Sequence, residues 1–471
     1  MCAVAHRHMF RSGVPLRRSR RKYCTTMENV LDPLDQFTFD AERATGVASI
    51  PHPFWVYNRP VDIDGLRKFQ HHLRKGLLAR RIQPSPLPFG RHRWVSAEGP
   101  SDIEIVATPR PREELDAWFE EQATTRIDPE HGPGWHLAVL PFTDGGAAVS
   151  MVISHCITDG IGLFTAIADA AEGRDAPISW PAAGSRRRWQ ALREDAGQAV
   201  RDIPALGRGA VAAVRLARRA SREAAGAASS TRPLKLPTGA DEPVTPSVAT
   251  AFVNVDKWDA RADALGGTSN ALLAGLAANL AQRKGRVTAD GSVLMKLLVN
   301  ERVAGDTRAN AISSLTVTVD PASATTDLRE TRAAVKKALT SHQELRGDER
   351  AVMSFVPLLG LLPKRLVRLF DKTVVVSSMG AVEPAVIRPD GTDADLFGAR
   401  VSYPTVSKAL MDSMGGVLYV LSATTQRQVS VTVTAYEPGC TNSNESLRQD
   451  LSSALNDFSL TGTYIGVPPT A

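Results

Sequence analysis

Residues 149–160 read Val-Ser-Met-Val-Ile-Ser-His-Cys-Ile-Thr-Asp-Gly, an apolar run that ends in a polar turn. The apolar residues Val149, Met151 and Ile153 fall at every second position, which predicts a largely buried strand that stops where the polar residues begin. His155 then lies at the mouth of this strand. Histidine as a residue type is suited to proton transfer near neutral pH, because its ordinary pKa is roughly 6.5.

The turn formed by residues 155–160 has two interpretations. Asp159 can hold the loop through an ion pair or by accepting hydrogen bonds from backbone amides, and Gly160 permits a tight turn into a following helix. In the functional interpretation His155 is a general base. In the structural one it hydrogen-bonds only within its own loop. A single short motif produces many false matches, so the rest of the chain must decide between them.

Length and composition indicate a soluble globular protein of two lobes. A chain of 471 residues exceeds the usual size of one hydrophobic core, so we expect two lobes of about 150 to 220 residues. The four cysteines form no Cys-x-x-Cys pair and do not cluster with histidine, which argues against a zinc site and a disulfide framework. No apolar run is long enough to span a bilayer. We therefore expect a cytoplasmic protein.

Residues 1–26 account for the net positive charge. They hold seven cations and no acid, so the rest of the chain is near −1 (6 − 7). This arm lacks the apolar centre of a secretory signal. It is either a disordered basic tail or the result of counting from Met1 instead of Met27. We favour Met27, because the globular pattern begins directly after it.

The periodicities divide the remainder into two α/β lobes and a linker. Residues 27–183 alternate strand-like runs with helices at 61–80 and 112–125, whereas residues 184–246 are rich in Ala, Arg, Gly and Pro and predict a basic helical linker. Residues 247–471 form the second lobe. Its predicted helices are 270–284 and 327–345, and its predicted strands are 250–255, 293–299, 315–319, 373–376, 417–421 and 429–434.

Two basic or apolar stretches leave the question of a membrane contact open. On a helix over residues 208–225, five arginines fall within an arc of about 100°, opposite alanine. They are Arg208, Arg215, Arg218, Arg219 and Arg222. Such a stripe is either a solvated face or a contact for anionic phospholipid or an acidic partner. The apolar run Val352–Pro363, followed by Lys364, Arg365 and Arg368, is either an interfacial segment or a core helix broken by proline.

A series of short motifs along the chain follows the order of one known family. The motifs are Leu31-Asp32-Pro33-Leu34-Asp35, Pro133-Gly134-Trp135, His155-x-x-x-Asp159-Gly160, Asn270-Ala271, Asn300-Glu301-Arg302, Ala309-Asn310-Ala311-Ile312-Ser313, Ser377-Ser378-Met379-Gly380, Gly398-Ala399-Arg400-Val401 and Tyr403-Pro404. Together they resemble the wax ester synthase/diacylglycerol acyltransferase family, a branch of the CoA-dependent acyltransferase superfamily that also holds condensation domains and polyketide-associated acyltransferases. The resemblance covers residues 28 to about 462.

Four positions depart from the family pattern, and one of them is Ala309, which replaces the usual glycine. Ser154 stands where the family usually has the first of two adjacent histidines, while the second, which carries the chemistry by resemblance, is kept as His155. Gly134 replaces the usual leucine and Ala271 the usual aspartate. These differences leave catalysis in place but bear on which acceptor the protein uses.

The resemblance implies a fold and a reaction. The fold is α/β, with two chloramphenicol-acetyltransferase-like lobes of mixed sheets flanked by helices and an active-site tunnel between them. The reaction is acyl-CoA-dependent O-acyl transfer, in which His155 accepts the proton of an acceptor hydroxyl and returns it to the departing thiolate. Asp159 is expected to pair with Arg302 across the lobes in a structural role, with Gly160 and Asn300 as further support.

Other site assignments are less direct. Ser377, Ser378 and Ser422 are candidate donors to the thioester oxyanion, together with backbone amides near Gly160. Trp135 and Asn270 are candidate substrate contacts. The histidines lack ligand spacing with carboxylates, so we expect no metal. No cofactor is expected to be bound, since acyl-CoA is a substrate, and dispersed aromatic residues give no sign of nucleic-acid binding.

The substrates follow from the resemblance alone. It implies a long-chain acyl donor and, as acceptor, a lipid alcohol, diacylglycerol or glycolipid, with peripheral contact to the inner face of the membrane left open. Two alternatives also stay open. One is an acyltransferase or condensation-type enzyme that takes its acyl group from a carrier protein, and the other is a catalytically silent lipid-binding relative.

Overall fold

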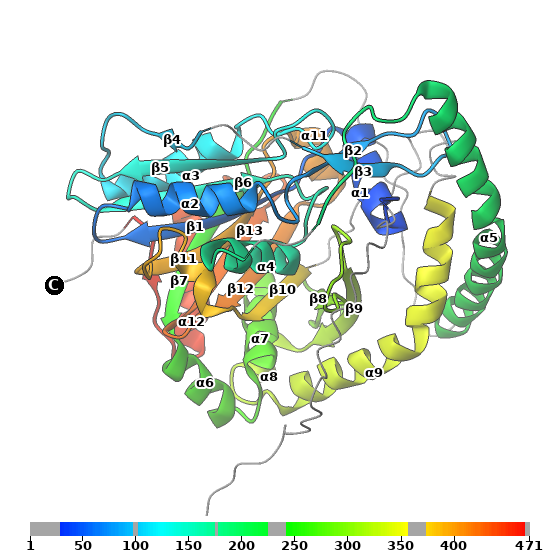
Figure 1. Cartoon of the computed structure of the whole chain (residues 1–471). Coiled ribbons are helices and arrows are strands. Elements are labelled where there is room, and N and C mark those ends of the chain that lie inside the picture. Colours follow the sequence, from blue (N-terminus) through cyan, green and yellow to red (C-terminus); the bar gives the residue numbers. More distant parts are fainter. Residues whose placement is uncertain (1–28, 98–101, 175–177, 225–241, 357–373, 467–471) are drawn as a thin grey trace, which may run out of the picture.

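Two β-sheets flanked by helices form the body of the protein (Figure 1). The structure is a computed structural model and describes residues 29–97, 102–174, 178–224, 242–356 and 374–466. The mixed α/β class predicted from the sequence is confirmed. The basic arm at residues 1–26 and most of the apolar run after Val352 lie outside the described residues.

The first sheet carries the strand that ends at His155. Its five strands run in the order β11-β1-β6-β5-β4. Their bounds are Ile50–Tyr57 (β1), Glu104–Ile105 (β4), Trp135–Pro141 (β5), Ala147–Ile153 (β6) and Leu396–Ser402 (β11). All seven residues of β6 are buried, as the apolar alternation predicts. A separate two-stranded sheet pairs β2 (Arg80–Gln83) with β3 (Arg93–Ser96).

The second sheet has seven strands in the order β14-β7-β13-β12-β10-β8-β9. Their bounds are Ser247–Asn254 (β7), Val293–Asn300 (β8), Ile312–Val319 (β9), Val374–Ala381 (β10), Val417–Thr424 (β12), Gln428–Tyr436 (β13) and Thr463–Tyr464 (β14). The strand β10 lies parallel to both β8 and β12, whereas the other pairs are antiparallel. The sheet is therefore mixed.

Helices cover both sheets and one long pair extends along the edge. Their bounds are Pro33–Thr45 (α1), Ile63–Leu73 (α2), Leu115–Ala123 (α3), Gly160–Ala171 (α4), Arg188–Ala224 (α5), Val255–Ala264 (α6), Ser269–Arg283 (α7), Pro321–Ala324 (α8), Arg329–Val352 (α9), Lys408–Ser413 (α11) and Asn444–Asp457 (α12). The helix α7 is buried along most of its length and packs in the hydrophobic core of the second sheet. The helix α5 packs against α9 at the outer edge of the molecule (Figure 1).

Three boundaries differ from the sequence-based predictions. The helix predicted over 61–80 ends at Leu73, because Arg80 is drawn into the strand pair β2–β3 and its side chain is fully buried. The helix within the linker begins at Arg188, twenty residues before Arg208, and its first turns are held by buried Asp195, which bonds with Ser85 and Arg93. The sheets also do not divide at residue 247: β11, from the C-terminal half, pairs with β1 as an edge strand of the first sheet.

Candidate active site

His155 follows directly after β6 and lines a cavity between the two sheets. Its backbone is fixed on both sides: the N–H donates to the carbonyl of Ser49 at 3.2 Å, and the carbonyl accepts a hydrogen bond from Nδ2 of Asn310 at 3.2 Å. The imidazole is half-buried, and its buried Nδ1 has no hydrogen-bond partner among the described residues. Within the described part of the chain, no carboxylate therefore orients this ring through Nδ1.

Asp159 uses both of its carboxylate oxygens to build the turn. Oδ1 accepts from the N–H of Gly162 at 2.7 Å, so Asp159 is the N-cap of α4. Oδ2 accepts from the N–H of Ala311 at 2.7 Å and from Nη2 of Arg302 at 2.9 Å. Because its oxygens are occupied in this way, Asp159 has a structural place in the turn and does not form a dyad with His155.

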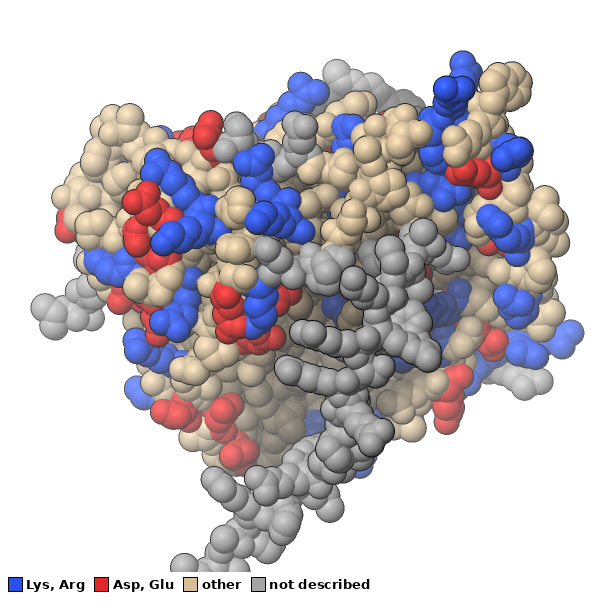
Figure 2. All heavy atoms as spheres, in the orientation of Figure 1, with Lys and Arg blue, Asp and Glu red and all other residues tan. Residues whose placement is uncertain are grey.

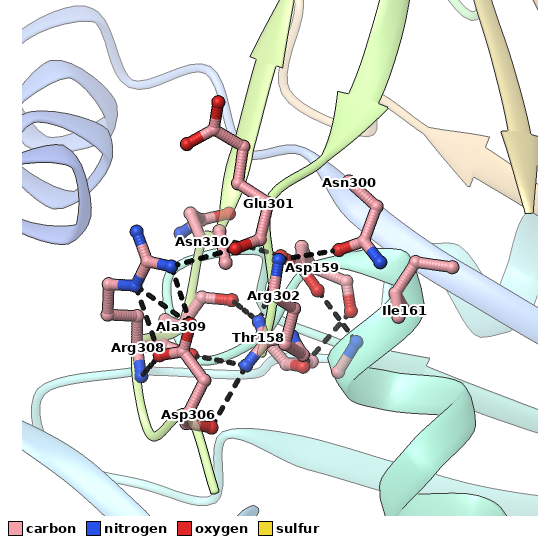
Figure 3. A network of polar contacts seen from close by, with 12 residues as sticks. Thr158, Asp159, Ile161, Asn300, Glu301, Arg302, Asp306, Arg308, Ala309 and Asn310 are labelled. Atoms are coloured by element: carbon pink, nitrogen blue, oxygen red, sulfur yellow. Dashed lines mark hydrogen bonds and ion pairs between the residues drawn. The ribbon is translucent and has the colours of Figure 1, made fainter. Parts of the chain in front are cut away.

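Arg302 closes the connection between β8 and β9 around Asp159. Besides its ion pair with the carboxylate, the guanidinium donates to the carbonyls of Asp306, Arg308 and Ala309 at 3.2, 2.9 and 2.9 Å. Figure 3 shows these bonds converging on Arg302 from one loop. The side chains of Asp159 and Arg302 are only 1% and 8% exposed. This buried ion pair therefore joins the end of the second sheet to the histidine turn of the first.

Asp35, in α1, is a second anchor of the same loop. Its fully buried carboxylate accepts from the N–H groups of Ala309 and Asn310 at 2.9 and 2.7 Å. Burial raises the pKa of Asp35 to about 6, against the opposing effects of Arg80 and of the two backbone hydrogen bonds. Since the Asn310 side chain holds the His155 carbonyl, Asp35 positions the histidine indirectly. The sequence motifs contain Asp35 and Asn310 but do not indicate that they meet.

Arg80 lies buried behind the histidine turn. It donates to the carbonyl of Ile157 at 2.7 Å and to that of Thr307, and its guanidinium stacks 4.0 Å from the ring of Trp94. Burial lowers the pKa of Arg80 to about 9, although nearby Asp35 raises it. Nothing in the local sequence distinguishes this arginine from the many exposed ones, so sequence analysis missed it.

The cavity at His155 is bounded by both sheets and by the start of α4. Its apolar walls include Leu163, Phe164, Leu298, Val299, Ile312, Met379, Val401, Tyr419 and Leu421. Asn300, Ser377 and Ser378 contribute polar groups beside His155. A site between the sheets agrees with the expected position of the active site. An apolar cleft with a few polar groups is typical of a small-molecule site.

Three of the candidate contacts do not line this cavity. Trp135 is 1% exposed and packs in the core of the first sheet, because it lies opposite Ile153 in the β5–β6 pair. Asn270 is exposed in the first turn of α7, next to the cap at Thr268. Ser422 is buried on β12 beside Ser378. The described residues also contain no group of three or more His, Cys, Asp or Glu that could hold a metal ion.

Gly160 is needed for a reason other than the one predicted. It is the first residue of α4 and its φ is not positive, so the turn itself does not demand glycine. A Cβ at this position would lie 2.7 Å from Sδ of Met379, which comes from β10 of the other sheet. The glycine therefore permits close approach of the two sheets at the cavity.

Two of the departures from the family pattern have a local explanation. The hydroxyl of buried Ser154 accepts a hydrogen bond from the N–H of Cys156 at 3.2 Å and so supports the turn around His155. The side chain of Ile157 fills the space beside Gly134, where an added Cβ would meet it at 2.7 Å. Ile157 thus takes the place that a leucine at 134 would occupy.

Comparison with known families decides the identity of the chain. The family model described as the wax ester synthase/diacylglycerol acyltransferase catalytic domain matches residues 31–273, which is more than half of the sequence. The chain belongs to this family. No curated protein matches the sequence. Membership in the wax ester synthase/diacylglycerol acyltransferase family makes the protein an acyltransferase, as the ordered motifs predicted.

Solved structures support the fold of this acyltransferase. It is similar to the first condensation domain of the CDA synthetase, with a TM-score of 0.58 at 13% identity over 94% of this chain and 98% of that one. The trichothecene 15-O-acetyltransferase from Fusarium sporotrichioides gives 0.57 at 13% identity over 91% and 94%. The wax ester synthase/diacylglycerol acyltransferase from Marinobacter aquaeolei VT8 gives 0.52 at 15% identity over 91% and 98%. At these identities the likeness concerns the two-lobed fold alone.

Proposed function

We propose that this acyltransferase moves an acyl group from acyl-CoA to a hydroxyl, with His155 as the general base. The observation that supports the role of His155 most is its position: it lies at the end of a buried strand, in a cavity between the sheets, with its backbone held on both sides. These backbone bonds set the point from which the imidazole projects into the cavity. Positioning of two substrates around it would supply much of the rate.

The proposed reaction has one transfer step and no covalent enzyme intermediate. The acceptor oxygen attacks the thioester carbonyl while His155 takes the hydroxyl proton, and the histidine then protonates the departing CoA thiolate. The tetrahedral oxyanion needs hydrogen-bond donors. Ser377 and Ser378 line the cavity beside the histidine and are the proposed donors. Asp159 and Arg302 keep the turn in place and transfer no proton in this scheme.

The proposed substrates are a long-chain acyl-CoA and a lipid alcohol, diacylglycerol or glycolipid. The family supports an acceptor of the alcohol type, and the apolar walls of the cavity suit an acyl chain. We further propose that the protein contacts the inner face of the membrane peripherally. In the described part of the chain no helix combines the length and apolar character needed to cross a membrane.

Acyl transfer by the purified full-length protein tests this proposal. Palmitoyl-CoA is offered with a panel of long-chain alcohols, diacylglycerol and glycolipids, and thiol release and product mass are followed together. His155→Ala is expected to lower kcat by about 10² to 10⁴. The matched control is His71→Ala, an exposed position on α2 that is expected to keep full activity.

Three outcomes would reject the proposal or part of it. Unchanged activity in His155→Ala would remove the histidine from the mechanism. If the protein turned over an acylated carrier protein but not acyl-CoA, the carrier protein would be the acyl donor in place of CoA. Binding of acyl chains without turnover of either donor would leave a silent lipid-binding relative.

A further inference from the structure

The outward face of α5 combines exposed apolar side chains with arginines. Five of the eleven exposed large hydrophobic residues in the described part of the chain lie on this one helix. They are Trp189 at 83%, Val200 at 65%, Ile203 at 59%, Val211 at 53% and Val214 at 50% exposure. At 100° per residue they fall within an arc of about 80°. A monomeric soluble protein seldom exposes such a stripe of large apolar side chains to water.

The opposite face of α5 is already used for packing. Ala191, Asp195, Gly209 and Ala212 are buried, and the carbonyl of Ala205 accepts a hydrogen bond from Ser354 beyond α9. The apolar stripe therefore lies on the free side of the helix pair, at the outer edge of the molecule (Figure 1). Packing among the described residues does not account for it.

Charge along the helix is separated in the same direction. Arg201, Arg208 and Arg218 are exposed on or beside the stripe, and Figure 2 shows many basic side chains, with a few acidic ones between them, along this edge. The three acids of α5 whose side chains are described pair with cations of the protein body: Glu194 and Asp195 with Arg186, and Asp202 with Arg91. Among the described side chains of α5, no acid falls within the arc of the apolar stripe, although Glu194 stays 36% exposed on its flank.

We infer that this face of α5 docks on an anionic phospholipid surface. An amphipathic helix with a tryptophan and aliphatic side chains flanked by arginines fits the boundary between lipid headgroups and acyl chains. The arginines meet the negative headgroups, and the apolar stripe enters the interface between them. The inference names the surface that makes the peripheral membrane contact proposed above and the charge of the lipids that it binds. It does not depend on the proposed acyl-transfer reaction.

Trp189 provides a direct probe of docking. The other six tryptophans of the chain are at most 7% exposed, so only Trp189 can change its environment when the folded protein meets a surface. Full-length protein is titrated with vesicles of phosphatidylcholine, with or without phosphatidylglycerol. We expect a blue-shifted emission and protection from an aqueous quencher with phosphatidylglycerol, both lost in Trp189→Phe. Added salt should weaken the binding.

Two triple variants separate the charge from the apolar contribution. Replacing Arg201, Arg208 and Arg218 by Gln should lower the affinity for phosphatidylglycerol vesicles by about 100-fold. Replacing Val200, Ile203 and Val211 by Ser should lower it by about 10-fold or more. The matched controls are Arg74, Arg332 and Arg427 to Gln, and Ile105, Val287 and Leu294 to Ser, all exposed positions outside α5. Circular dichroism confirms that each variant is folded.

Several outcomes overturn the inference. These are equal vesicle affinity in the α5 variants and the wild type, equal losses in the α5 and control variants, or binding of polyglutamate in place of vesicles, which would indicate an acidic protein partner. Acyl transfer to a soluble alcohol in detergent should stay unchanged in every α5 variant. Vesicle binding without any acyl transfer would leave the inference standing and reject the proposed function.

Discussion

The carboxylate of Asp159 and the guanidinium of Arg302 lie 2.9 Å apart, almost fully buried, where the connection of the second sheet meets the histidine turn of the first. Removing either partner leaves the other charge buried and unpaired, which typically costs about 3 to 5 kcal/mol. We expect Asp159→Ala and Arg302→Ala each to lower the free energy of urea unfolding by such an amount. The double variant should lose less than the sum, because removing both partners leaves no buried charge unpaired.

The control for this cycle is the exposed ion pair between Arg283 and Asp457, whose side chains are 33% and 40% exposed. Solvent screens this pair, so breaking it should cost about 1 kcal/mol or less. Losses at Asp159 and Arg302 that simply add would show that the two residues support the fold independently.

The sequence predicts the histidine turn well because its determinants are local. The apolar alternation of residues 149–153 specifies a buried strand, and an aspartate in such a turn is expected to accept hydrogen bonds from backbone amides, as Asp159 does. Both appear in the structure at the predicted places. The pairing of Asp159 with Arg302 came from family resemblance, since no local pattern relates residues 143 positions apart.

Contacts between distant segments could not be predicted in this way. Asp35 and Asn310 meet across 275 positions, and β11 returns from the C-terminal half to pair with β1. Chain topology, which periodicity does not report, brings these segments together. The same limit explains why the helix over 61–80 was predicted too long: pairing of Arg80 with Ser96 in β2–β3 overrides the local helical pattern.

The raised pKa of Asp35 predicts a pH-dependent contribution to stability. The folded pKa is about 6, whereas an unfolded aspartate titrates near about 3.9. Between these values the folded state keeps a proton that the unfolded state has released, so the contribution of Asp35 is largest below about pH 4 and falls as pH rises to about 6. Because two pKa units correspond to about 3 kcal/mol, the contribution of Asp35 to the free energy of unfolding should change by about that amount across this range.

Urea unfolding of the wild type and Asp35→Asn across this pH window measures the effect. The stability difference between the two proteins should shift against the wild type as pH rises from about 4 to about 6. Asp259→Asn, at an exposed position of α6, is the control and should keep the wild-type slope. If the free energy of unfolding of Asp35→Asn changed with pH as steeply as that of the wild type, another group would be responsible for the pH dependence.

Ser377 is the better placed of the proposed oxyanion donors. It is 3% exposed and lines the cavity together with Tyr419, whose pKa is raised by burial to about 12. A donor that acts in the transition state affects kcat more than KM. We expect Ser377→Ala to lower kcat by about 10² to 10³.

Two further variants test whether this loss is specific. Tyr419→Phe removes a second hydroxyl from the residues that line the cavity and should lower kcat by a smaller factor than Ser377→Ala does. Ser422→Ala alters a buried serine of the same sheet that does not line the cavity, and should retain wild-type kinetics. If Ser377→Ala raised only KM, the serine would be a substrate contact and not an oxyanion donor.

Gly160 and Met379 test how closely the two sheets must approach at the cavity. An added Cβ at Gly160 would lie 2.7 Å from Sδ and 3.1 Å from Cε of Met379, the flexible end of a side chain that also lines the cavity. The backbone of Gly160 is ordinary for a helix start, so Gly160→Ala should cost little stability. It should instead displace Met379 and lower kcat/KM several-fold, which steady-state kinetics with a long-chain acyl-CoA would measure.

Two controls distinguish this clash from a general effect of adding a methyl group. Combining Gly160→Ala with Met379→Ala should give the same kcat/KM as Met379→Ala alone, because the contact no longer exists. Gly162→Ala would bring a Cβ within 2.9 Å of the buried guanidinium of Arg302, which cannot move away, and should destabilise the fold by about 1 to 3 kcal/mol. Gly197→Ala, inside α5 with open space around its Cβ, should leave kcat/KM unchanged and raise the free energy of unfolding by about 1 kcal/mol or less. If Gly160→Ala lowered kcat/KM by the same factor with and without Met379, the glycine would serve the turn itself.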